Sequence, residues 1–143
     1  MKTVVINLPY RSDRLSAFNE NNSIEYELFN AVDGKSISYE RLKEQGYDVN
    51  HNWTDPILGT SLTKGEVGCF LSHWQIWNKC IQKNESLIVL EDDAILTEEF
   101  DMEEIEELPY DFVYLGWKEM EEKIRIDDTF SKPVYPYWTL AYM

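Results

Sequence analysis

Short apolar runs rich in β-branched residues alternate along this chain with longer segments whose apolar positions recur every three or four residues. The first pattern predicts β-strands, and the second predicts amphipathic helices. Strands are expected over residues 3–8, 25–32, 87–90 and 110–115, and helices over residues 11–20, 38–45 and 63–81. Residues 98–107 are expected to form an acidic helix, or partly a loop. Residues 47–61 are rich in Asn, Asp, Pro and Gly, which predicts an irregular surface loop. Strands that alternate with helices indicate an α/β fold with a mostly parallel sheet.

The segment that begins at Thr63 carries the clearest helix signals. Thr63 and Glu66 match a capping box, in which each side chain accepts a hydrogen bond from the other residue's backbone N–H. Apolar residues then recur at helical spacing, and we expect this stripe to face the core: Val67, Phe70, Leu71, Trp74, Trp77 and Ile81.

Length, composition and charge narrow the class of protein. With 143 residues, 43% of them hydrophobic and 14% aromatic, the chain is expected to form one folded domain over residues 1–143. Its net charge of -14 repels nucleic acid and anionic membrane surfaces, and no apolar run approaches the length of a membrane span. Cys69 and Cys80 lie about 16 Å apart on one predicted helix, too far for a disulfide. Reduced thiols without a signal peptide favour a cytoplasmic protein.

Three adjacent carboxylates, Glu91, Asp92 and Asp93, follow an apolar run that is typical of a buried strand. Ligands of open α/β sheets bind beyond the carboxyl ends of the strands, which makes these residues a candidate site. If the chain stays extended, Glu91 and Asp93 point to one side and can share one Mg²⁺ or Mn²⁺ ion. An acidic turn that opens a solvated helix explains the same residues equally well.

Two arginines follow the first predicted strand. Pro9 ends that strand, and Arg11 and Arg14 lie about one turn apart at the start of the next helix. Backbone donors at a helix N-terminus and guanidinium groups both favour phosphate, so these residues are candidate phosphate contacts. The alternative is that Arg14 pairs with an acid at the surface.

Glu66 and His73 lie seven residues apart on the long helix and are expected to stack on one flank of it. Cys69 and His73 have a spacing that is known in metal sites, but two ligands do not make such a site. A half-buried, hydrogen-bonded helix residue is the simpler interpretation of His73. No glycine-rich phosphate loop is present.

Four segments together resemble glycosyltransferase family 25, the lipooligosaccharide and collagen galactosyltransferase-like group. They are residues 5–14 (VINLPYRSDR), residues 62–73 (LTKGEVGCFLSH), residues 89–94 (VLEDDA) and residues 29–34 (FNAVDG). Each segment alone is a weak signal. Their order and spacing also resemble those of the family, so the resemblance covers nearly the whole chain.

The resemblance implies a GT-A-like fold, which is a Rossmann-like three-layer sandwich, and a UDP-hexose as the donor. It implies that Glu91 and Asp93 hold a divalent ion, usually Mn²⁺, against the donor diphosphate, and that Asp92 contacts the ribose or the sugar. Further residues fall where the family is expected to bind the donor: Arg11, Arg14, Asp33 and Lys64.

The implied reaction is inverting transfer of a hexose, galactose or glucose, to a hydroxyl group of a glycan, lipooligosaccharide or protein acceptor. The metal would stabilise the departing nucleoside diphosphate, and a base would take the acceptor proton. Glu66 and His73 are candidate bases only because they fall in the segment that is expected to border the donor.

One departure from the family concerns the end of the chain. Family members are expected to continue beyond the segment that matches residues 136–143, so we expect the C-terminal acceptor part to be absent. A strand-like end at residues 139–143 would leave an open edge, which a homodimer would cover. Two other functions remain open, a non-catalytic binding or assembly module and a metal-dependent phosphohydrolase, although the latter requires additional ligands.

Overall fold

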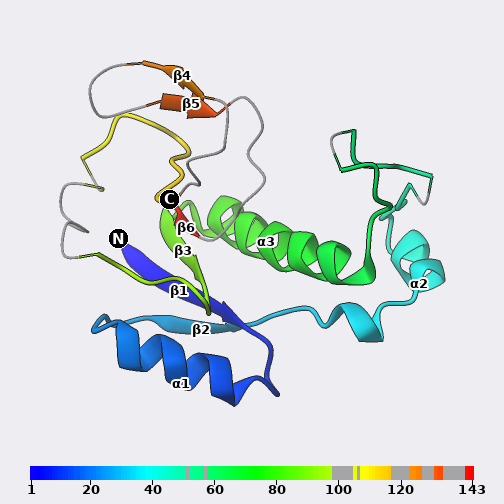
Figure 1. Ribbon diagram of the computed structural model, residues 1–143, viewed down its shortest axis with the longest axis horizontal. Helices are drawn as coiled ribbons and strands as arrows, with labels where there is room; N and C mark the ends of the chain where they lie inside the picture. Colours follow the sequence, from blue (N-terminus) through cyan, green and yellow to red (C-terminus); the bar gives the residue numbers. More distant parts are fainter. Residues whose placement is uncertain are drawn as a thin grey trace. The chain divides into compact units, whose positions relative to one another are not determined.

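A computed structural model describes residues 1–50, 52–56, 58–97, 105, 107–116, 123–126, 131–133 and 141–143. The chain forms two compact units (Figure 1). The first unit comprises residues 1–7, 11–29 and 86–143, and the second comprises residues 8–10 and 30–85. Most of the helix expected over residues 98–107 lies outside the described residues. None of the helices in the described part is long and apolar enough to span a membrane.

The first unit is built on a sheet with the strand order β2-β1-β3-β6 (Figure 1). Its strands are β1 (Lys2–Asn7), β2 (Glu27–Asn30), β3 (Leu87–Glu91) and β6 (Ala141–Tyr142). β1 and β3 are parallel, with Val4 opposite Val89 and Ile6 opposite Glu91. Helix α1 (Ser12–Asn21) follows β1 in the chain. These elements confirm the predicted mixed α/β architecture with parallel central strands.

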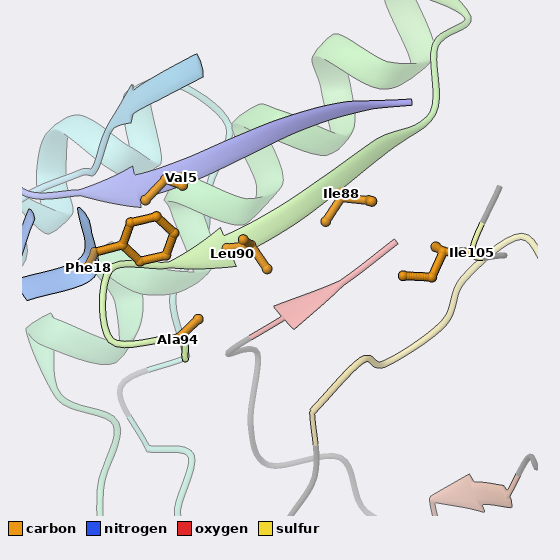
Figure 2. Close-up of a cluster of buried hydrophobic side chains, with 6 residues drawn as sticks. All are labelled: Val5, Phe18, Ile88, Leu90, Ala94 and Ile105. Carbon is orange, nitrogen blue, oxygen red and sulfur yellow. The ribbon is translucent and has the colours of Figure 1, made fainter. Parts of the chain in front are cut away.

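The core of the first unit explains why β1 and β3 contain continuous runs of apolar residues. Ile88, Val89 and Leu90 are all buried, so both faces of β3 are covered. Figure 2 shows the cluster on one of these faces, which comprises Val5, Phe18, Ile88, Leu90, Ala94 and Ile105. Ala94 belongs to this core, which brings the chain after the three carboxylates back against α1 and β3.

The C-terminal strand β6 is not an open edge, which corrects the prediction from the sequence. Tyr142 is buried and pairs with Val89 of β3 on one side and with Tyr114 on the other. Val113 and Met143 exchange two backbone hydrogen bonds of 3.1 and 2.8 Å. The strand expected over residues 110–115 is therefore a single bridge in an otherwise irregular segment. A separate hairpin joins β4 (Lys123–Arg125) to β5 (Ser131–Pro133).

The second unit consists of helices and loops. It contains the 3₁₀ helix η1 (Gly34–Ser36) and the helices α2 (Tyr39–Glu44) and α3 (Lys64–Lys83). The predicted capping box at the start of α3 is confirmed, and α2 begins after Ser38 as expected. Ile37, Leu42, Val67 and Leu71 form the core of this unit.

The apolar stripe predicted on α3 is wrong in part. Val67 and Leu71 are buried, but Phe70 is 53% exposed, Trp74 is 37% exposed and Ile81 is 78% exposed. The buried face is shifted toward small and polar residues and comprises Val67, Gly68, Leu71, Ser72, His73 and Ile76. The rings of Phe70, Trp74 and Trp77 pack on one another instead, with centroids 6.2 to 6.4 Å apart. Small residues allowed the backbone to approach closely, and hydrophobic periodicity does not detect this.

Candidate functional site

The three carboxylates lie at the end of β3 in a tight turn. β3 ends at Glu91, and the Ala94 N–H donates a hydrogen bond of 3.0 Å to the Glu91 carbonyl oxygen. Asp92 and Asp93 are the central residues of this turn, which we call the acidic turn (Glu91–Ala94). The chain therefore does not stay extended beyond Glu91, so strand alternation does not place Glu91 and Asp93 on one side. Glu91 is half-buried, while Asp93 is exposed.

Arg14 binds two carboxylates of the acidic turn. It lies in the first turn of α1, and its Nη2 atom contacts Asp92 Oδ1 and lies 2.8 Å from Asp93 Oδ2. The structure thus brings together two motifs that the sequence predicted separately. Arg14 does pair with acids, as the alternative prediction held, but these acids belong to the candidate site itself.

Asp92 is held on both of its carboxylate oxygens. Oδ1 contacts Arg14, and Oδ2 accepts a hydrogen bond of 2.7 Å from Asn7 Nδ2. Asn7 is buried at the end of β1 and also donates to the Arg11 carbonyl oxygen at 3.1 Å. Asp92 is only 9% exposed, whereas the Asp93 side chain is 56% exposed. These contacts make Asp92 an internal partner of Arg14, and Asp93 the acid that faces solvent.

Sequence reasoning missed Asn7. A polar amide directly after the apolar residues Val4, Val5 and Ile6 of β1 was the available signal, since a buried amide must find hydrogen-bond partners. Its partner Asp92 lies 85 residues further along the chain, and no local pattern connects the two residues.

Arg11 binds the exposed carboxylate of Asp13, its neighbour at the start of α1. Its Nε and Nη2 atoms each donate a hydrogen bond of 2.8 Å to the carboxylate of Asp13. The hydrogen bonds from Arg11 lower the pKa of Asp13 to about 2, with a smaller contribution from the charge of the guanidinium. Arg11 and Arg14 therefore have different surroundings, although the sequence places them one turn apart.

Asp33 and Lys64 belong to the second unit, where the side chain of each forms a hydrogen bond with a backbone group. Asp33 caps η1, because its Oδ1 atom accepts a hydrogen bond of 2.9 Å from the Lys35 N–H. Lys64 Nζ donates to the Ile37 carbonyl oxygen at 2.9 Å and lies 5.5 Å from the centroid of the Tyr39 ring. Their neighbourhood depends on Gly34, because a Cβ atom there would collide with the backbone of Lys64.

Glu66 and His73 lie on one flank of α3, as their separation of seven residues predicts, but their environments differ. Glu66 is exposed, and its Oε2 atom accepts hydrogen bonds of 2.6 Å from both the N–H and the hydroxyl of Thr63. These hydrogen bonds lower the pKa of Glu66, which makes it a weaker base. His73 is fully buried, not half-buried, and its ring centroid lies 6.4 Å from that of Trp77.

Comparisons with known proteins cover most of the chain. A family model described as glycosyltransferase family 25 (LPS biosynthesis protein) matches residues 1–130. Inactive glycosyltransferase 25 family member 3 of Mus musculus is 36% identical over 147 residues, covering 94% of this chain and 25% of that protein. Procollagen galactosyltransferase 1 of Danio rerio is 34% identical over 157 residues, covering 97% of this chain and 26% of that protein.

A third relative is the glycosyltransferase 25 family member of Drosophila melanogaster. It is 34% identical over 147 residues, which cover 94% of this chain and 24% of that protein. The chain thus spans about a quarter of the length of these curated relatives.

Proposed function

The chain belongs to glycosyltransferase family 25, and on this premise we propose that it is the donor-binding part of a metal-dependent hexosyltransferase. In the proposal, a GT-A-like domain binds a UDP-hexose, with galactose or glucose as the sugar. The sugar passes to a hydroxyl group of a glycan, lipooligosaccharide or protein acceptor with inversion. The supporting observation is the pairing of Arg14 with the acidic turn beyond the carboxyl ends of the parallel strands β1 and β3.

The residues of the acidic turn suit a hard divalent cation. Carboxylate oxygens are the ligands that Mg²⁺ and Mn²⁺ prefer, and Glu91 and Asp93 supply them at the end of β3. Asp93 is exposed, and its ion pair with Arg14 is made through Oδ2. A bound Mn²⁺ would neutralise charge on the departing nucleoside diphosphate. Both carboxylate oxygens of Asp92 are already bound within the protein. We therefore propose that Asp92 positions Arg14 and does not contact the sugar.

Arg14 supplies the second positive charge of the proposed site. Its side chain is 35% exposed, and planar guanidinium groups bind phosphate oxygens through parallel hydrogen bonds. Asp92 and Asn7 fix the direction of this group before a ligand arrives, which reduces the ordering cost of binding. The proposal assigns no base to Glu66, because its carboxylate is committed to the capping box.

A binding experiment on the chain tests the proposal. Thermal unfolding is followed with UDP-galactose, UDP-glucose or a GDP-sugar, each with and without Mn²⁺, since a ligand of the native state raises the midpoint. We expect a rise with a UDP-sugar and Mn²⁺ together. Asp93→Asn should abolish the Mn²⁺-dependent part, while the exposed control Asp48→Asn retains it. Absence of any shift with every nucleotide sugar would refute the catalytic proposal and leave the fold untouched.

A second candidate function is a non-catalytic binding or assembly module with the same fold. The observation in its favour is that one of the relatives at 36% identity is named inactive. It predicts that Mn²⁺ and a UDP-sugar bind without release of UDP in the presence of acceptors. Metal-dependent UDP release that Asp93→Asn abolishes would exclude this function.

A further inference from the structure

A buried asparagine holds the segment that follows the acidic turn. Asn22 directly follows α1, and its Nδ2 atom donates hydrogen bonds to the carbonyl oxygens of Ala94 (3.0 Å) and Phe18 (2.9 Å). Its Oδ1 atom accepts a hydrogen bond of 2.8 Å from the Leu96 N–H. The side chain is buried and uses both of its donor hydrogens and its acceptor oxygen.

These contacts replace the strand partner that residues 94–96 lack. The Ala94 carbonyl and the Leu96 N–H lie two residues apart and bind the same side chain, as they would bind a neighbouring strand. Residues 92–97 form no regular strand, so these backbone groups depend on the side chain of Asn22. Figure 2 shows Ala94 beside Leu90 and Phe18 at this point of the core.

Helix α1 contacts the segment 92–96 at two places. Arg14 contacts Asp92 near the start of the helix, and Asn22 contacts Leu96 just beyond its end. Eight helical residues separate Arg14 from Asn22, which is about 12 Å along the helix axis. The segment from Asp92 to Leu96 has five residues, and it begins within the tight turn that the hydrogen bond from the Ala94 N–H to the Glu91 carbonyl oxygen closes. Asn22 therefore holds the last residue of the acidic turn, Ala94, and the segment that follows the turn, at Leu96.

We infer that Asn22 is a positioning residue of the acidic turn, because its contacts to Ala94 and Leu96 fix Asp92 and Asp93 opposite Arg14. The inference rests on the proposed function only for the identity of the ligand, which is Mn²⁺ with UDP. Among the described residues, the Asn22 side chain hydrogen-bonds to the backbone of Phe18, Ala94 and Leu96, and not to the carboxylates or the guanidinium group. It acts through the backbone that carries them.

The test compares Asn22→Asp with Asn21→Asp. The first variant keeps an acceptor for Leu96 but places an oxygen against two carbonyl oxygens, which removes two hydrogen bonds. Asn21 is an exposed neighbour whose Nδ2 atom donates to the Ala17 carbonyl oxygen within α1, and Asn21→Asp adds the same charge at the same helix end. Asn22→Ser removes the amide without adding charge, and it replaces Asn22→Asp if that variant does not fold.

The first measurement is the NMR spectrum of the Arg14 guanidinium group in the metal-free protein. Wild type and Asn21→Asp should show slowly exchanging signals from the ion pairs with Asp92 and Asp93. Asn22→Asp should show the averaged, rapidly exchanging signal of an arginine in solvent. A role confined to global stability would leave this native-state signal unchanged, and unchanged Arg14 signals would overturn the inference.

The second measurement is the affinity for Mn²⁺ and UDP by titration calorimetry. We expect the dissociation constant to rise at least tenfold in Asn22→Asp and less than twofold in Asn21→Asp. Altered Arg14 signals with equal affinities would overturn the link between Asn22 and the ligand. If wild type binds neither Mn²⁺ nor UDP, the proposed function fails, while altered Arg14 signals still support the positioning role.

Discussion

Two glycines of α3, three residues apart, should respond in opposite ways to the same substitution. A Cβ atom at Gly65 would meet only Thr63 Oγ1, at an ordinary contact distance of 3.7 Å. A Cβ atom at Gly68 would lie 2.6 Å from the Val32 carbonyl oxygen and 2.9 Å from the Gly34 nitrogen. Both distances are too short, and both involve backbone atoms. We therefore expect Gly65→Ala to stabilise the protein and Gly68→Ala to destabilise it.

The magnitudes follow from two opposing contributions. Replacement of glycine by alanine within a helix contributes roughly 0.5–1 kcal/mol of stability, and Gly65 lies in the first turn, where the low end of this range applies. Overpacking a tight contact costs roughly 1–3 kcal/mol. Gly68→Ala must also move residues 32–34, which the Ser72 hydroxyl holds through hydrogen bonds of 2.8 Å to the Val32 N–H and the Gly68 carbonyl. We expect a net loss of about 2 kcal/mol for Gly68→Ala and a gain of about 0.5 kcal/mol for Gly65→Ala.

Urea unfolding followed by tryptophan fluorescence measures the free energy of unfolding of both variants. The slope with denaturant must stay constant across the variants, because a changed slope indicates a changed unfolded or native state. The refuting result is a higher midpoint for both variants, which would show that residues 32–34 do not lie against Gly68. The result also concerns the candidate site, since this contact places Asp33 and Gly34 beside the start of α3.

Two further predictions concern groups with lowered pKa values. The lowered pKa of Glu66 stabilises the fold above its unfolded-state pKa of about 4.3, and this stability is lost as the pH falls through the folded-state pKa. Glu66→Gln should therefore lower the urea midpoint relative to wild type at pH 7, and its midpoint should approach that of wild type at pH 3. The exposed control Glu44→Gln should leave the midpoint unchanged at both pH values. A Glu66→Gln effect of equal size at both pH values would contradict this reasoning. Arg11→Gln should raise the NMR titration midpoint of Asp13 from about 2 toward its ordinary value, and an unchanged midpoint would show that Arg11 does not bind this carboxylate.

The sequence predicted those parts of the fold that local signals determine. The apolar runs of β1 and β3 and the capping box of Thr63 and Glu66 depend on neighbouring residues, so the pattern alone was sufficient. The apolar stripe of α3 failed because periodicity identifies an amphipathic helix but not its partner. Gly68 and Ser72 were the informative residues, since their small size permits close contact with residues 32–34.

The sequence predicted individual residues of the candidate site but not the contacts between them. Arg14 and the carboxylates were each identified, and their ion pairs depend on a contact between segments nearly eighty residues apart. Asn7 and Asn22 were missed, because their partners lie 85 and 72 residues away, and an isolated Asn carries no signal for such a contact. The alternation of Glu91 and Asp93 failed because β3 ends in a turn at Glu91.

The contacts of the acidic turn separate residues that serve the fold from residues available to a ligand. Family relatives named inactive and relatives named galactosyltransferase match this chain at similar identities of 36% and 34%, so overall identity does not distinguish the two candidate functions. Asp92 is buried with both oxygens bound, and a chain without catalysis would still need it for folding. Asp93 is 56% exposed, and an exposed ion pair contributes little stability. Folding alone therefore gives little reason for an acid at this position, and its presence beside Arg14 favours a ligand at this turn, which both candidate functions require.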